Sequence, residues 1–185
     1  MGASKNDDRE QYAYFSLPYR QETVKLFIKK GNSVKTELTS LSDLVDKPYM
    51  IGVEAGYYYG KEYQDLIKRP DFQKNISEVV DLEQNVTLLL DGKLDGLLVD
   101  LITMQAFVNK YDMHNTFEQH PLEIYSADIY LMLSKKNYDE FLLNKINQAI
   151  ITLKNNGSLK EINRRWSEMQ EANQALLANR NRRVF

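Results

Sequence analysis

The sequence predicts an α/β protein with a largely parallel sheet. Short apolar segments rich in Val, Ile and Leu alternate along the chain with segments of helical period. Residues typical of turns and helix caps separate these segments. The hydrophobic share of 43% and the charged share of 27% are those of a globular protein, so a packed core is expected. A chain of 185 residues is long enough for one large domain or two small ones.

Five segments have the composition of β-strands, and helices follow most of them. The predicted strands are Thr23–Lys29, Tyr49–Glu54, Ile76–Val80, Leu94–Val99 and Ile129–Ser134. The predicted helices are a short one signalled by Ser40 and Asp43, Tyr57–Ile67, one capped by Asp81 that ends at Gly92, Leu101–Tyr111, one from Asn137 to Asn156, and Leu159–Met169. The face expected for Leu101–Tyr111 carries Leu101, Met104 or Gln105, and Val108. The helix after Asn137 carries an apolar stripe of Leu143, Ile146, Ile150 and Leu153, and the last helix is expected to bury Ile162 and Trp166.

Composition and charge exclude several classes of function. Lys and Arg number 24 against 26 Asp and Glu, a formal net charge of −2, so neither nucleic acid nor an anionic membrane is an expected partner. The absence of Cys excludes disulfides and thiolate chemistry. No apolar run is long enough for a membrane span, and the first residues lack the apolar region of a signal peptide.

Metal and nucleotide sites are not expected either. His114 and His120 stand six residues apart without a further ligand nearby, and the glycines from Gly52 to Gly56 lack the Lys-Ser/Thr of a phosphate loop. No cofactor is implied. Residues 170–185 contain few large apolar side chains and form a tail without a firm docking face.

Six segments resemble, in order and spacing, the amino-acid-binding type II periplasmic binding proteins, the extracellular solute-binding proteins of family 3. They cover nearly the whole chain. They are Gly2-Ala3-Ser4 with Arg9 and then Phe15-Ser16-Leu17-Pro18-Tyr19; Leu26 to Gly31; Leu41-Ser42-Asp43-Leu44; Ile51 to Gly56; Leu90 to Asp100; and Asn156-Gly157-Ser158-Leu159 with Ile162 and Trp166.

The resemblance implies two lobes with mainly parallel sheets, joined by two hinge strands, that close on a ligand. Val24–Lys29 and Ile129–Ser134 would be the hinge strands. Residues 1–29 and 128–169 would form part of lobe one, residues 30–127 lobe two, and residues 170–185 a C-terminal tail. The family's first lobe begins well upstream of the serine-to-arginine motif, so lobe one is expected to be incomplete and N-terminally truncated in this chain.

An amino-acid ligand needs donors at its carboxylate and an acceptor at its ammonium group. Arg9 can donate two parallel hydrogen bonds to a carboxylate, and Ser4 occupies the family position that adds a hydroxyl. Asp100 matches the residue that holds the ammonium group, although as a plain sequence feature it also suits the N-cap of the helix after it. Arg9 could likewise be a surface arginine in a charged stretch, with no role in binding.

Gly56 is expected to expose backbone N–H groups to an anion, because it lies between a strand and a helix. The family often has a small hydroxyl residue after it. This chain has Tyr57-Tyr58-Tyr59 there instead. Tyr58 is kept as a ligand contact, with a bulky phenol in place of the small hydroxyl side chain. For Tyr57 and Tyr59, the alternative is that they pack between helix and sheet. Phe15 and Tyr19 are expected to pack in the core.

The function implied is non-enzymatic capture of an amino acid or similar solute for an ABC transporter, with its permease as partner, in the periplasm or outside the cell. A ligand-sensing domain of a signalling receptor is the second hypothesis. The third is an enzyme resembling cyclohexadienyl dehydratase, with Glu54 or Asp100 as a protonated acid. Because lobe one is expected to be incomplete, a homo-oligomer formed through its bare apolar faces is also predicted.

Overall fold

The chain divides into two compact units in the computed structural model, which describes residues 2–32, 36–162 and 164–165. Unit one is Met1–Glu22 with Ala127–Phe185, and unit two is Thr23–Ser126. Both divisions fall within long strands, at Glu22 and at Ser126. The sequence predicts two lobes that move as separate bodies, with residues 30–127 as lobe two. These lobe limits and this motion stay predictions.

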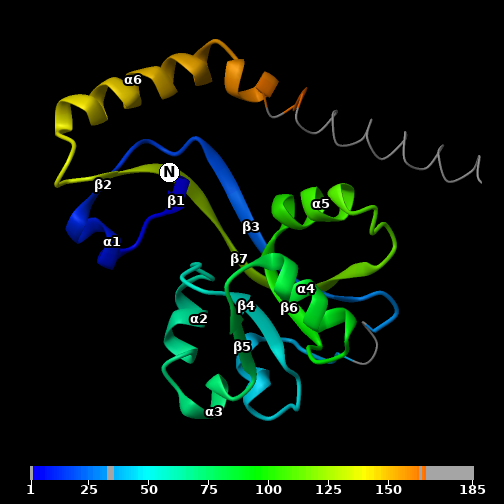
Figure 1. Ribbon diagram of the computed structural model, residues 1–185. Helices are drawn as coiled ribbons and strands as arrows, with labels where there is room; N and C mark the ends of the chain where they lie inside the picture. Colours follow the sequence, from blue (N-terminus) through cyan, green and yellow to red (C-terminus); the bar gives the residue numbers. More distant parts are fainter. Residues whose placement is uncertain (1, 33–35, 163, 166–185) are drawn as a thin grey trace, which may run out of the picture. The chain divides into compact units, whose positions relative to one another are not determined.

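Unit two is built on a sheet with the strand order β7-β3-β6-β4-β5 (Figure 1). The strands are β3 (Arg20–Lys29), β4 (Ile51–Glu54), β5 (Ile76–Val79), β6 (Gly96–Asp100) and β7 (Phe117–Ser134). Strand β4 runs parallel to β5 and β6, whereas β3 runs antiparallel to β6, with Val24 opposite Asp100. The α/β class is confirmed, but the sheet is mixed, because apolar composition does not encode a strand's direction.

The described residues of unit two form five short helices. They are η1 (Leu41–Val45), α2 (Lys61–Leu66), α3 (Pro70–Gln73), α4 (Leu82–Leu90) and α5 (Leu101–Lys110). Helix η1 is a 3₁₀-helix, and Ser40 and Asp43 form the predicted capping box before it. Asp81 caps α4, because its Oδ1 accepts a hydrogen bond from the Gln84 amide at 2.8 Å.

The alternation of side chains along the strands creates two cores. Val24, Leu26 and Ile28 point to one face of the sheet, where they pack with apolar residues of η1, α2 and α3. Phe27 points to the other face, where Leu97 and Val99 join apolar residues of α4 and α5. Unit two is therefore a sheet between two helical layers.

One helix prediction in unit two needs correction. The helix predicted over Tyr57–Ile67 begins only at Lys61, and Pro70 begins α3 as its first residue instead of merely ending α2. The predicted face of α5 is confirmed, because Met104 is buried and Leu101 and Val108 pack partly buried against the same core, which Phe107 also joins.

Unit one contains two three-residue strands that the sequence did not reveal. β1 (Gly2–Ser4) and β2 (Ala13–Phe15) both pair antiparallel with the last part of β7, opposite residues 129–131 and 132–134 respectively. Helix α1 (Asp7–Tyr12) connects them and begins after Asn6, whose side chain accepts a hydrogen bond from the Arg9 amide.

The segment Phe15-Ser16-Leu17-Pro18-Tyr19 is held to β7 and to α6 (Glu140–Asn155) by hydrogen bonds. Ser16 donates its amide to the Leu131 carbonyl, and its hydroxyl accepts from the Leu131 amide at 2.9 Å. The Leu17 amide donates to Asn147 Oδ1 at 2.7 Å. Phe15 and Tyr19 are both half-buried, and the Phe15 ring meets Tyr130 edge to face. The segment thus connects β7 with α6 within unit one.

The apolar stripe of α6 is covered only in part. Ile150 is 5% exposed, Leu143 and Ile146 are half-buried, and Leu153 is 36% exposed. Ile162 is 56% exposed, which corrects the expectation that it is buried. Trp166 and residues 170–185, for which packing and a tail were predicted, lie outside the described residues.

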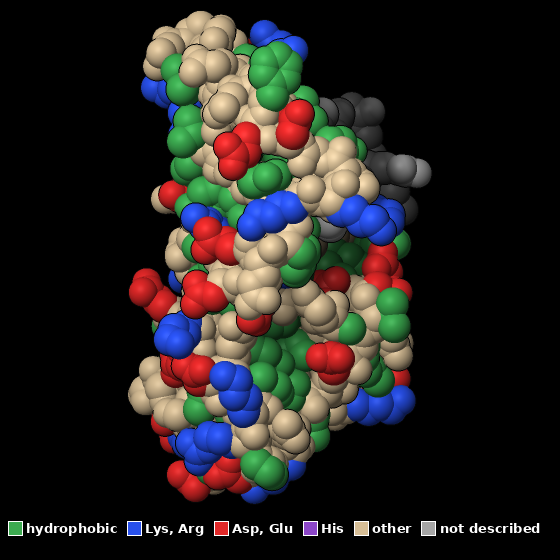
Figure 2. Space-filling model, turned by 90° about the vertical axis from the view of Figure 1, so that its left-hand side faces the viewer, with side chains coloured by type: hydrophobic (Ala, Val, Ile, Leu, Met, Phe, Trp, Pro, Cys, Tyr) green, Lys and Arg blue, Asp and Glu red, His purple; other side chains and the backbone are tan. Residues whose placement is uncertain are grey.

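The surface carries both signs of charge. Figure 2 shows Lys and Arg side chains interspersed with Asp and Glu over the face it presents. Among the residues that the structure describes, no helix combines the length and the apolar character that crossing a membrane requires.

Candidate functional site

Ser4 and Arg9, two of the predicted ligand-binding residues, are neighbours in unit one. Ser4 ends β1 and is 5% exposed, and the half-buried Arg9 lies in the first turns of α1. Arg9 Nη1 donates a hydrogen bond to the Ser4 carbonyl oxygen at 2.9 Å. A guanidinium group has five N–H donors, so this bond orients the group and leaves others for a ligand carboxylate.

Asp100, the predicted acceptor for an ammonium group, ends β6 in unit two and is 4% exposed. Its Oδ2 accepts hydrogen bonds from the Thr103 amide at 3.0 Å and the Thr103 hydroxyl at 3.1 Å, so it caps α5. Its Oδ1 accepts from the Thr23 amide at 3.3 Å. A carboxylate can accept about four hydrogen bonds, so the observed cap leaves capacity for one more donor.

Gly56 lies in the loop between β4 and α2, where its φ of +71° suits a residue without a side chain. The Tyr57 amide closes the turn on the Glu54 carbonyl. The amides of the next three residues, from Tyr58 to Gly60, donate to no other group in the described part of the chain. Tyr58 is half-buried, and Tyr59 and Gly60 are buried, so these amides are not the exposed run that was predicted, and the helix begins at Lys61 instead of Tyr57.

The three tyrosines of this loop have different environments. Tyr58 is half-buried, and its ring meets the Tyr125 ring edge to face at a centroid distance of 5.3 Å. Tyr59 is 2% exposed, and its hydroxyl accepts a hydrogen bond from the Glu54 amide at 2.7 Å. Tyr57 is 36% exposed. Tyr59 is thus the residue that holds the loop against β4, which agrees with the packing alternative given for it.

Glu54 is half-buried at the carboxyl end of β4. Burial, and after it the nearby charges of Asp81 and Glu83, raises the pKa of the Glu54 carboxyl group. The carboxyl ends of parallel strands are where open α/β sheets place their ligand contacts, so Glu54 lies at the same edge as Asp100.

His120 has structural surroundings. His120 is 3% exposed, its Nε2 lies 2.7 Å from the Thr36 carbonyl oxygen, and its Nδ1 accepts from the Leu122 amide at 3.1 Å. These partners assign the proton to Nε2 and a neutral ring. In the described ranges, no three His, Cys, Asp or Glu side chains come together as metal ligands.

Comparison with known proteins identifies the family of the chain. Residues 1–169 match the bacterial extracellular solute-binding proteins, family 3. The L-cystine-binding protein TcyJ of Escherichia coli strain K12 is 24% identical over 161 residues, which are 87% of this chain and 56% of TcyJ.

Two solved structures share the fold. The amino acid ABC transporter substrate-binding protein AbpA of Streptococcus pneumoniae, bound to L-arginine, has a TM-score of 0.70 at 20% identity, with 92% of this chain and 66% of AbpA covered. The ligand-binding core of GluR0 in complex with L-glutamate has a TM-score of 0.69 at 18% identity, with 89% and 69% covered.

The chain spans a little over half the length of TcyJ and about two thirds of the matching structures, so it covers part of the type II periplasmic binding protein domain. The family consists mainly of non-enzymatic solute-binding proteins. With its match over residues 1–169, the chain belongs to the bacterial extracellular solute-binding proteins of family 3.

Proposed function

We propose that this chain binds an α-amino acid for an ABC transporter and works outside the cytoplasm with a permease as its partner. The proposal is supported by the family and by relatives that bind L-cystine or L-arginine. The single observation that carries it is the contact between Arg9 and Ser4, which orients a guanidinium group with unused donors.

Each predicted residue has a role in this proposal. Arg9 and Ser4 bind the ligand carboxylate, and the amide of the half-buried Tyr58 after Gly56 adds a donor beside the Tyr58 ring. Asp100 accepts from the ligand ammonium group while it caps α5. No covalent chemistry is required, because binding and release complete the function.

The test compares Asp100→Asn with Asp81→Asn. Both aspartates cap helices of unit two, and Asn caps a helix about as well as Asp, so each substitution removes a charge and keeps a cap. Calorimetry with L-cystine, L-arginine and L-glutamate should show affinity for at least one of them. Asp100→Asn should lower that affinity by roughly a hundredfold or more, as expected when an unpaired buried charge is left behind, and Asp81→Asn should not. Near-native affinity in Asp100→Asn would exclude the role of Asp100.

A sensing role is the second candidate, and the similarity to the GluR0 ligand-binding core favours it. The ligand contacts would be the same, and only the partner would differ. The gene decides between the two roles, because a sensor continues into a membrane span and an output domain, whereas a transport receptor does not.

A dehydratase-like enzyme is the third candidate, and the raised pKa of Glu54 favours it, since such an enzyme needs a carboxyl group that stays protonated. Turnover of prephenate that is lost in Glu54→Gln would establish this activity. Binding of prephenate without turnover would reject it.

A further inference from the structure

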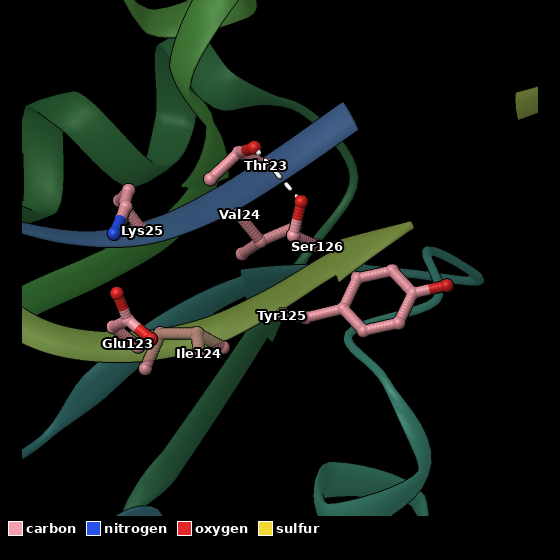
Figure 3. Close-up of a pocket in the computed structure, with 7 residues that line it drawn as sticks. All are labelled: Thr23, Val24, Lys25, Glu123, Ile124, Tyr125 and Ser126. Atoms are coloured by element: carbon pink, nitrogen blue, oxygen red, sulfur yellow. Dashed lines mark hydrogen bonds between the residues drawn. The ribbon is translucent and has the colours of Figure 1, made fainter. Parts of the chain in front are cut away.

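A pocket of about 450 Å³ lies between β3 and β7 within unit two (Figure 3). Residues 23–25 of β3 and residues 123–126 of β7 line it, and none of them belongs to the residues proposed above as ligand contacts. Its volume is in the range of small-molecule sites, about 300–1,000 Å³. The pocket is therefore large enough for a ligand of its own.

Two opposite charges face this pocket without an ion pair. Lys25 comes from β3 and is half-buried, and Glu123 comes from β7 and is exposed. Figure 3 shows the Lys25 amine and the Glu123 carboxylate on the same side of the pocket, from facing strands. Within the described ranges, neither side chain has a hydrogen bond or a salt bridge. A half-buried ammonium group has lost some of its water and has gained no protein partner in exchange.

The rest of the lining is polar at one end and apolar at its base. The Thr23 and Ser126 hydroxyls lie 3.2 Å apart and join the two strands by a hydrogen bond. Val24 is fully buried and Ile124 packs against the same core, so the apolar part of the lining belongs to the hydrophobic core. The pocket thus offers one cation, one anion and two hydroxyl groups.

We propose that this pocket is a second binding site, and that its ligand is a small zwitterion whose ammonium group pairs with Glu123 and whose carboxylate pairs with Lys25. A ligand with a single charge would satisfy one of these residues and be repelled by the other. A zwitterion satisfies both at once. The hydroxyls of Thr23 and Ser126 donate to or accept from either end.

The first experiment uses zwitterions of increasing length as probes. Glycine, β-alanine and 4-aminobutyrate separate the two charges by one, two and three methylene groups, and acetate and methylammonium are the singly charged controls. In an amide NMR titration, at least one zwitterion should shift the resonances of Lys25, Glu123 and Ile124 and saturate them, and the controls should not at the same concentration. Shifts confined to the neighbourhood of Gly56 and Asp100 would overturn this second site while supporting the proposed function.

The second experiment uses charge variants. Lys25→Gln and Glu123→Gln should each lower the affinity of the best probe at least tenfold, whereas Lys93→Gln, which changes an exposed cation of the same unit, should not. The double exchange Lys25→Glu with Glu123→Lys keeps both charges and should recover part of the binding. If the Gln variants alter only the stability of the fold and leave the affinity unchanged, the two residues are a structural cross-strand pair and the proposal is wrong.

Discussion

Asn85 lies on α4 with 1% of its surface exposed, and neither polar atom of its side chain has a hydrogen-bond partner among the described residues. It packs directly against β4 at Gly52. A Cβ atom on Gly52 would lie 2.3 Å from Asn85 Oδ1 and 2.6 Å from Leu94 Cδ1. The absence of a side chain at Gly52 is therefore what allows α4 to approach the sheet at this point.

Replacing Asn85 by Leu should stabilise the protein. Leu has the same branching without the polar atoms, it favours a helix more than Asn does, and a buried polar group without a partner costs about 1–3 kcal/mol. We expect a free energy of unfolding in urea that is higher by about 1 kcal/mol. Gly52→Ala should lower it instead because of the close contacts. A less stable Asn85→Leu would show that the amide has a favourable role.

The pKa of Glu54 gives a stability change with a definite direction. A carboxyl group with a raised pKa in the folded state binds its proton more tightly there than in the unfolded chain, so stability falls as the pH rises from the ordinary value of about 4.3 through the raised one. Glu54→Gln removes this loss. The variant should match the wild type below the ordinary pKa and exceed it at neutral pH, as measured by urea unfolding across that range. A difference that is the same at every pH would contradict this assignment.

At the scale of elements, the sequence predicted best the helices whose two ends carry clear capping residues. Helix α4 has Asp81 as its N-cap and Gly92 after its end, and it was found with both limits. Strand β7 was predicted only from Ile129 onward. In its earlier part, His120 occupies a buried position and makes hydrogen bonds with Thr36 and Leu122. A polar residue at a buried position interrupts the alternation of apolar and polar residues by which a strand is recognised in a sequence.

The late start of α2 also has a local cause. Tyr59 is held in the core by the hydrogen bond from the Glu54 amide, which requires an extended loop. Gly60 then takes a φ of +95°, and a Cβ atom there would lie 2.7 Å from the Tyr125 ring. Neither the hydrogen bond of Tyr59 nor the close approach of Gly60 to Tyr125 can be inferred from a run of tyrosines before a helical pattern.

Gly60→Ala should therefore destabilise the protein more than Gly92→Ala does. Both glycines have positive φ, but a Cβ atom on Gly92 would meet nothing within 4 Å. Gly92→Ala should thus cost the backbone strain alone, about 1 kcal/mol, and Gly60→Ala should add the contact with Tyr125. Unfolding in urea measures both values. Equal losses would mean that the Tyr125 ring moves aside freely.

At the scale of the whole molecule, the resemblance carried the functional prediction, because the residues alone left alternatives open. The structure brings Ser4 and Arg9 together, and it shows that Asp100 is a helix cap, as the plain sequence feature allows. Its role in binding stays a prediction. The burial of Tyr59 and Gly60 after Gly56 depends on loop conformation, which composition and spacing do not encode.

Self-association of the chain also stays a prediction. The exposed apolar residues of unit one include Phe141 at 67% and Ile162 at 56%, whereas Ile150 on the α6 stripe is covered. Light scattering at micromolar concentration tests the expected dimer or higher oligomer. A stable monomer there would contradict it.

The last prediction follows from where the cores lie. Both hydrophobic clusters consist of residues of unit two. In unit one, the buried apolar side chains among the described residues are Ala13, Ile129, Leu133 and Ile150. Because apolar burial is the main source of stability, unit two should be the last part of the molecule to open.

Native-state hydrogen exchange measures this order directly. The amides of Ile51–Val53 in β4 and Leu97–Val99 in β6 should exchange most slowly, with opening free energies near that of global unfolding. The amides near Phe15 and Tyr138 should exchange faster, because their segments open with unit one while the two cores remain packed. Equal protection in the two units would show that the chain unfolds as one cooperative body, and reversed protection would place the stable core in unit one.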